Sequence, residues 1–256
     1  MAWPASKVSK LENGRQTPTE ADIRGWTATT GSEAEAEALL ASLHTLELKH
    51  AEWQRQFNLG LHPHQDEIAE LDRKTRLFRV FESTVIPGLL QTPAYAHARF
   101  VQGAMMFRTP NDVDEAVRRR VQRQDVFYRP DKRFHFVLTE AALRFRLCPP
   151  DIMLGQLDRL VSLSMLPNVR LGIIGFETQY TVAPWHGFWL LDKELVMVET
   201  FSAELNLAQP QEIEVYGGVF ASLAAVAVYG RAARAIITRV ADELAAELPE
   251  DGAAFE

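Results

Sequence analysis

The chain has 256 residues, of which 47% are hydrophobic and 24% charged, enough for one large domain with a substantial core and a smaller N-terminal part. Its formal net charge of −7 argues against a body that wraps nucleic acid through a broad basic surface, so any DNA affinity must be local. The single cysteine, Cys148, excludes an internal disulfide framework. The longest uncharged stretch, Val215 to Gly230, is shorter than the roughly 20 apolar residues of a membrane span. With no export signal found either, we expect a cytoplasmic protein that does not associate with a membrane.

A short helix is predicted at Ala5 to Glu12, because Val8 and Leu11 are three residues apart and share one face. Small, polar and basic side chains cover the rest of it. A helix in the DNA major groove needs small residues for close approach, donors for base edges and cations for phosphates. The candidate DNA-binding residues are Ser6, Lys7, Ser9, Lys10 and Arg15. The alternative is a solvated helix face, since the basic excess in this region is small.

Two capping boxes follow. Thr17 as N-cap, with Pro18 and Glu20 behind it, predicts a helix from about residue 18 to 29. Ser32 and Glu35 repeat the pattern and open a long amphipathic helix that runs to about residue 58. This connector, residues 32–62, either packs on its own domain or also carries a dimer seam.

The rest of the chain is predicted to be a mixed α+β domain at residues 63–247, with a short tail at 248–256. Strands are expected at 77–86, 134–140, 169–176, 187–192 and 195–201. Helices are expected at 65–74, 93–103, 112–127, 151–165 and 211–246. Strands and helices do not alternate regularly, which favours α+β over α/β.

The N-terminal string SKVSKLENGRQTPTEADIRGW resembles the third and fourth helices of the lambda-repressor-like, or XRE-type, helix-turn-helix regulators. Ser9, Glu12, Gly14 and Pro18 occupy the places of that family's pattern. The resemblance implies that residues 1–31 are the C-terminal half of a DNA-binding domain. Family members carry two further helices before the position of Trp3, on the order of 25 residues, and helix-turn-helix geometry needs them. We therefore expect the reader to be truncated here.

A second and more specific resemblance begins with FRVFESTVIPGLLQTPAYAHA at residues 78–98. It is similar to the large C-terminal domain of unknown function that follows an XRE-type reader in actinobacterial regulators described as antitoxin-like. The likeness continues through the Arg-rich segment 117–124 and covers residues 3 to roughly 247. The resemblance implies a transcriptional regulator that forms a homodimer. When the missing helices are present, this homodimer would bind operator DNA. The large domain would bind a signal or a small partner protein encoded nearby; the alternative is an interaction module that no longer binds DNA.

Other candidate groups favour plainer interpretations. The basic stretch from Arg118 to Arg133 is interleaved with acidic residues three or four positions away. This spacing favours ion pairs within the helix rather than a phosphate-binding face. Four residues could hold a metal but lack a well-spaced further ligand, and a solvated loop is expected instead. They are His62, His64, Asp66 and Glu67. Trp185, His186 and Trp189 are a candidate ligand pocket, with packing beside a turn as the alternative.

An enzyme is only a remote alternative. The chain contains no G-x-S-x-G, H-E-x-x-H, G-x-x-x-x-G-K or G-x-G-x-x-G motif. Asp192, Glu199 and Glu204 lie near predicted strand ends and could face a cleft, although acids at such positions are usually solvated. The sequence thus predicts no catalytic residue, no metal ligand and no cofactor.

Overall fold

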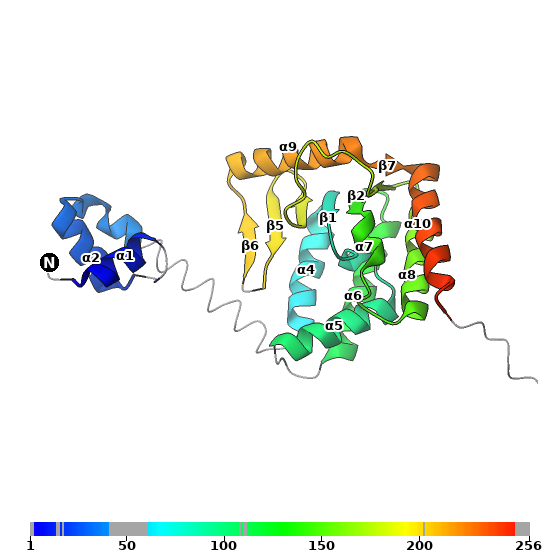
Figure 1. The fold of residues 1–256 in the computed structure, drawn as a ribbon, viewed down its shortest axis with the longest axis horizontal. Coiled ribbons are helices and arrows are strands. Elements are labelled where there is room, and N and C mark those ends of the chain that lie inside the picture. The colour runs from blue at the N-terminus through cyan, green and yellow to red at the C-terminus, as the bar shows by residue number, and fades with distance from the viewer. Residues whose placement is uncertain are drawn as a thin grey trace, which may run out of the picture. The chain divides into compact units, whose positions relative to one another are not determined.

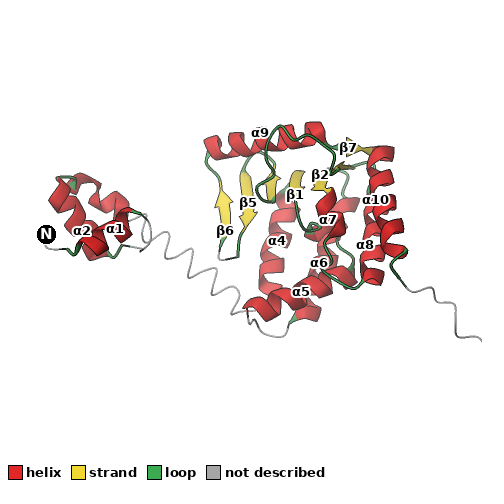
Figure 2. Ribbon diagram, in the orientation of Figure 1, coloured by secondary structure: helices red, strands yellow, loops and turns green. Residues whose placement is uncertain are grey.

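The computed structural model describes residues 3–13, 16, 18–40, 61–107, 109, 112–201 and 203–248. The chain divides into two compact units, residues 1–55 and 56–256. All the described strands belong to the second unit, and the first is helical in its described part (Figure 2). The mixed α+β class predicted from the sequence is confirmed. Within the described residues, each helix is too short or too polar to cross a lipid bilayer.

The N-terminal unit contains α1 (Ala5–Glu12), α2 (Glu20–Thr30) and the 3-10 turn η1 (Glu33–Glu35). The predicted first helix is confirmed, but α2 begins two residues later than expected. Its capping box is made by Thr19 and Asp22, whose side chains each accept the other's backbone N–H. Gly31, with a φ of 69°, ends α2 in the left-handed conformation that glycine adopts without strain.

The predicted second capping box is wrong, because the Ser32 side chain makes no cap hydrogen bond. Residues 36–40 are helical after η1. The rest of the predicted connector helix, and Thr17, lie outside the described residues. The expected domain boundaries after residues 31, 62 and 247 therefore stay predictions.

The large unit is built on a seven-stranded mixed sheet in the order β6-β5-β4-β1-β2-β3-β7. The strands are β1 (Leu77–Glu82), β2 (Arg133–Thr139), β3 (Val169–Ile174), β4 (Phe188–Leu191), β5 (Leu195–Glu199), β6 (Glu204–Leu207) and β7 (Val228–Tyr229). The three central strands β1, β2 and β3 are parallel, and the flanking strands run antiparallel to their neighbours. The helices are α4 (His62–Lys74), α5 (Pro93–Phe107), α6 (Val113–Arg123), α7 (Glu140–Arg144), α8 (Pro150–Leu163), α9 (Pro210–Val226) and α10 (Gly230–Ala245), with 3-10 turns η2 (Gly88–Leu90) and η3 (Gln124–Tyr128).

Helices cover both faces of the sheet. Phe78 and Phe136 belong to the larger apolar core, to which α4, α8 and α10 contribute. Phe81, three residues after Phe78, and Val137, one residue after Phe136, point to the other face and belong to a second core under α9. In Figure 1, α9 runs across the large unit from β6 towards β7, and α10 follows it beside α8. This burial on both faces follows from the apolar character of successive residues in β1 and β2.

Two elements differ from the sequence-based expectation. The helix predicted at 211–246 is two helices, because Ala227 turns to extended backbone and residues 228–229 pair with β3 as β7. Gly230, with a φ of 56°, then allows the chain to turn into α10. Strand β6 was not predicted, since its sequence ELNL is short and half polar.

Candidate functional site

The candidate DNA-binding residues lie on or just after α1. The side chains of Ser6, Ser9 and Lys10 are exposed there, so a ligand could reach all three. Arg15 lies outside the described residues. Val8 and Leu11 are only partly covered, because α1 buries no residue fully in the described unit. The α1 surface therefore combines small, polar and basic groups with a partly covered apolar stripe.

Lys7 has a different position from its neighbours. Its ammonium lies 2.5 Å from Asp22 of α2, whose side chain is only 5% exposed, and also over the ring of Trp3. This contact with Lys7 is the main reason that the pKa of Asp22 falls below its ordinary value. Lys7 thus joins α1 to α2, and Ser6, Ser9 and Lys10 remain as the described groups available to a partner.

The large unit contains a row of three glutamates across one end of the sheet. Glu82 ends β1, and the residue beside it in the β1–β4 register is Gly187, just before β4. Glu199 ends β5 and pairs directly with Glu204, the first residue of β6. Side chains in one row point to the same face of a sheet. All three glutamates therefore point to the face that α4 covers, and we call them, with His64 of α4, the glutamate row.

Gly187 makes room for the first of these carboxylates. A Cβ on Gly187 would overlap Glu82 Oε2, so the Glu82 side chain occupies the space that any other residue would fill. Burial, and then the negative charge of Glu199, raise the pKa of Glu82 to about 8, against the effect of a hydrogen bond from Trp189. Near neutral pH Glu82 is thus mostly protonated.

His64 brings an imidazole to the same place. Its Nε2 lies 3.6 Å from Glu204 Oε2. One ligand atom each from His64, Glu199 and Glu204 lie within 4.8 Å of one another. Burial lowers the pKa of His64 and raises that of Glu204. The predicted loop at His62 to Glu67 is wrong, since these residues form the first turns of α4, although Asp66 and Glu67 are solvent-exposed there as expected.

The motif IPGLLQT shapes the wall next to the row. Gly88 leaves space for the Arg120 guanidinium, which would lie 3.4 Å from a Cβ there. Arg120 donates to Gln91 at 2.7 Å, and Gln91 donates to the Ile86 carbonyl. Buried glutamines from two other helical segments hold the same turn, through the backbone of residues 90–92. The motif therefore has a structural role in this chain: its Gly88 and Gln91 accommodate the guanidinium of Arg120 from α6.

A second charged cluster lies beside the first and is built around a buried ion pair. Arg123 donates to Asp72 at 2.8 Å and to Gln65 at 2.7 Å, and the side chains of the ion pair are 3% and 1% exposed. Lys132 donates to three backbone carbonyls at the end of α4. We call Asp72, Gln65, Arg123 and Lys132 the paired cluster.

The basic stretch behaves only partly as predicted. Arg118 and Arg119 pair with Glu115 on the same helix, which confirms the expected intrahelical pairing for these two residues. Arg120 and Arg123 instead turn inward, to the two groups described above. The periodic pattern could not predict this, because the inward partners come from α4 and from the turn after η2.

The three residues of the predicted ligand pocket are separated. Trp189 lies on the α4 face and bonds to Glu82. The Nε2 atom of His186 lies 3.3 Å from the hydroxyl oxygen of Tyr216 of α9, on the opposite face of the sheet. Trp185 is 89% exposed. Only Trp189 therefore contacts the glutamate row.

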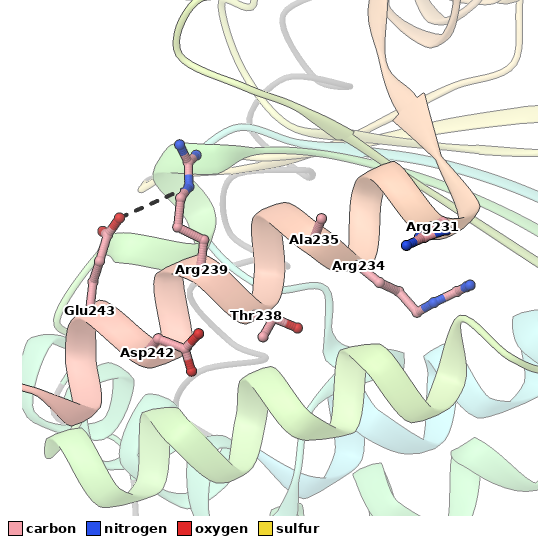
Figure 3. A pocket seen from close by; sticks show the side chains of 7 residues that line it. All are labelled: Arg231, Arg234, Ala235, Thr238, Arg239, Asp242 and Glu243. Carbon is pink, nitrogen blue, oxygen red and sulfur yellow. Dashed lines mark ion pairs between the residues drawn. The ribbon is translucent and has the colours of Figure 1, made fainter.

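A shallow hollow of about 530 Å³ lies on the outside of α10. Figure 3 shows the side chains that line it, among them Arg231, Arg234 and Asp242. Arg239 and Glu243 in this hollow form an ion pair with each other. Arg239 also pairs with Glu140 of the neighbouring α7, and Glu243 with Arg144 of the same helix. A ligand in this hollow would be held from one side only, by one helix of mixed charge, which makes it a weaker candidate than the glutamate row.

The fold and these groups define a mixed α+β domain with a buried polar site, preceded by a small helical unit. Residues 65–239, more than half of the chain, match the family model described as Domain of unknown function (DUF5753), and the chain belongs to that family. A comparison with curated proteins found no match. The matched segment contains Glu82, Glu199 and Glu204, whereas His64 lies one residue before it.

Proposed function

We propose that the chain is a DNA-binding transcriptional regulator of the XRE type, antitoxin-like, that acts in the cytoplasm as a homodimer. In this proposal α1 lies in the major groove when the two helices expected before Trp3 are present, and the large domain binds a signal or a partner protein. The proposal rests on one observation above the others: Ser6, Ser9 and Lys10 are exposed on one short helix while Lys7 anchors that helix to α2. Small donors and a cation on an accessible helix suit contacts to base edges and phosphates.

DNA selection tests this proposal. The full chain is incubated with fragments of its own genome, bound fragments are sequenced, and the recovered site is titrated beside a scrambled duplex. We expect Ser6→Ala or Lys10→Ala to weaken site binding by about 1–3 kcal/mol if these residues touch base edges. Lys193→Ala, an exposed lysine of the large unit, is the matched control. Equal affinity for the selected and scrambled duplexes would refute DNA reading by this chain.

A second candidate function is protein interaction by the large domain without DNA binding. Trp185 and Phe201 are 89% and 81% exposed. Trp185 lies in the segment that leads into β4 and Phe201 in the segment that follows β5, both at the end of the sheet that carries the glutamate row. Exposed aromatic side chains are enriched at protein interfaces. Co-elution of the chain with the product of a neighbouring gene, lost in Trp185→Ser/Phe201→Ser and kept in Tyr128→Ser, would favour this candidate. Tyr128 is a suitable control because it is 70% exposed elsewhere.

A further inference from the structure

We propose that His64, Glu199 and Glu204 form a binding site for a divalent transition-metal ion, and that Zn²⁺ fits it best. The three residues come from α4, β5 and β6, and their ligand atoms lie within 4.8 Å of one another. The His64 Nε2 to Glu204 Oε2 distance is 3.6 Å. Bonds of about 2.1 Å in a tetrahedral zinc site place neighbouring ligands roughly 3.4 Å apart. The distance between the His64 and Glu204 ligand atoms is therefore already close to that of a zinc site. The Glu199 side chain is exposed, so it is free to move towards the ion.

The environment of Glu204 points to a missing cation. Its Oε1 accepts a hydrogen bond from Asn206 at 2.8 Å. Its Oε2 is buried and accepts no hydrogen bond within the described part of the chain. Leaving a buried carboxylate oxygen without a donor costs stability. An ion between Glu204, Glu199 and His64 would supply the interaction that this oxygen lacks.

The charges around the site also favour a cation over an anion. Glu82 and Glu199 lie on the same row as Glu204, and their mutual repulsion is one cause of the raised pKa of Glu82. Of the nearby arginines, Arg123 pairs with Asp72, whereas Arg120 donates to the neutral Gln91 and keeps its charge, which interacts with Glu199. The positive charge of these arginines lowers the affinity for a metal ion, while Glu199 and Glu204 offer two carboxyl groups as ligands.

The ligand set selects the metal. Imidazole suits zinc and its transition-metal neighbours, whereas sites for Mg²⁺ and Ca²⁺ consist of oxygen ligands. Burial lowers the pKa of His64, and imidazole coordinates a metal ion in its neutral form. Three protein ligands on zinc leave a fourth position open for water or another ligand. The site is independent of α1, so it can exist whether or not the chain reads DNA.

Metal binding by the tag-free full chain tests the proposal. The chain is stripped with a chelator, dialysed, and titrated with Zn²⁺ by calorimetry; Co²⁺ is titrated in parallel and followed by its visible absorption, which reports tetrahedral coordination. We expect one ion per chain, a higher Tm with Zn²⁺ than without, and an intense Co²⁺ spectrum. His64→Ala and Glu204→Gln should each weaken Zn²⁺ binding by at least about tenfold, since even partners outside the ligand set change affinity about 10–100-fold.

Two control variants make the result decisive. His97→Ala and Glu194→Gln remove an exposed histidine and an exposed glutamate away from the site, and both should bind Zn²⁺ as the wild type does. Because Glu204→Gln keeps the side-chain shape, its circular dichroism shows whether a loss of binding reflects a lost ligand or a lost fold. No uptake by the wild-type chain, or equal weakening by His64→Ala and His97→Ala, would overturn the proposal.

Discussion

The glutamate row and the paired cluster lie next to each other on the α4 side of the large domain, and they differ in how their charges are balanced. In the paired cluster one Asp72 oxygen accepts from Arg123 at 2.8 Å, and Gln65 and three backbone carbonyls accept from Arg123 and Lys132. The other Asp72 oxygen accepts no hydrogen bond among the described residues, so the cluster differs from the glutamate row in having an arginine partner for its carboxylate. In the glutamate row His64, Glu199 and Glu204 bring ligand atoms within 4.8 Å of one another, and one oxygen of Glu204 accepts no hydrogen bond among the described residues. The first arrangement stabilises a fold, and the second is suited to binding a cation. Each prediction below separates these two roles.

The largest effect is expected from breaking the paired cluster. Asp72→Ala leaves the buried Arg123 uncompensated and should lower the free energy of unfolding by about 3–5 kcal/mol. Glu204→Gln should change it by less than about 1 kcal/mol, because it removes a charge that has no partner arginine. Urea unfolding measures both. Asp66→Ala is the control, since Asp66 is exposed on the same helix and pairs only at the surface with Arg119. Equal losses in the Asp72 and Glu204 variants would mean that the two groups do not differ in role.

The next effect is a pH dependence of stability from Glu82. Its pKa rises from an ordinary value of 4.5 to about 8 on folding. The folded chain therefore binds this proton more tightly than the unfolded chain, and the stabilisation is lost as pH rises from about 5 to 8. The loss cannot exceed about 1.4 kcal/mol per pH unit. Glu82→Gln does not titrate, so it should gain stability relative to the wild type over this range, whereas Glu194→Gln should not. Wild-type and Glu82→Gln curves that stay parallel would contradict the raised pKa.

The smallest effect tests the space beside the row. Gly187→Ala would push the flexible end of Glu82 aside rather than move the backbone, and should cost about 1 kcal/mol, at the low end for overpacking. It should also flatten the pH dependence described for Glu82. Gly217→Ala is the opposite control, because a Cβ there meets nothing within 4 Å on helix α9 and should stabilise the chain by about 0.4–1 kcal/mol. Stabilisation by both substitutions would show that Glu82 does not occupy this space.

Much of the fold was predictable because its signals are local. The apolar, β-branched and aromatic runs at residues 77–82 and 133–139 predicted β1 and β2 with errors of a few residues at most. The polar ELNL segment was missed, since only pairing with β5 makes it a strand. The break between α9 and α10 was missed because Ala227 is a good helix former, and pairing with β3 overrides that preference there.

The site was not predictable from the sequence, because its residues come from three separate parts of the chain: α4, β1 and the β5–β6 hairpin. His64, Glu82, Glu199 and Glu204 meet only when β4 and β5 join β1 in the observed order and α4 covers that face. The sequence named His64, Glu199 and Glu204 but expected them to be solvated, and it passed over Glu82. One usable signal was Gly187, a glycine between aromatic residues, which in a strand context marks close approach of another group.

The most direct test of the central claim is proton release on metal binding. Zn²⁺ is titrated into the metal-free chain near pH 7, by calorimetry, in two buffers of different protonation enthalpy. Glu82, with a pKa of about 8, is mostly protonated before binding, and a cation at Glu199 removes the repulsion that contributes to holding that proton. Because burial, the larger cause of the raised pKa, remains, we expect release of only part of the Glu82 proton, seen as a buffer-dependent heat that is reduced in Glu82→Gln. Zn²⁺ binding with the same heat in both buffers, or no binding, would contradict it.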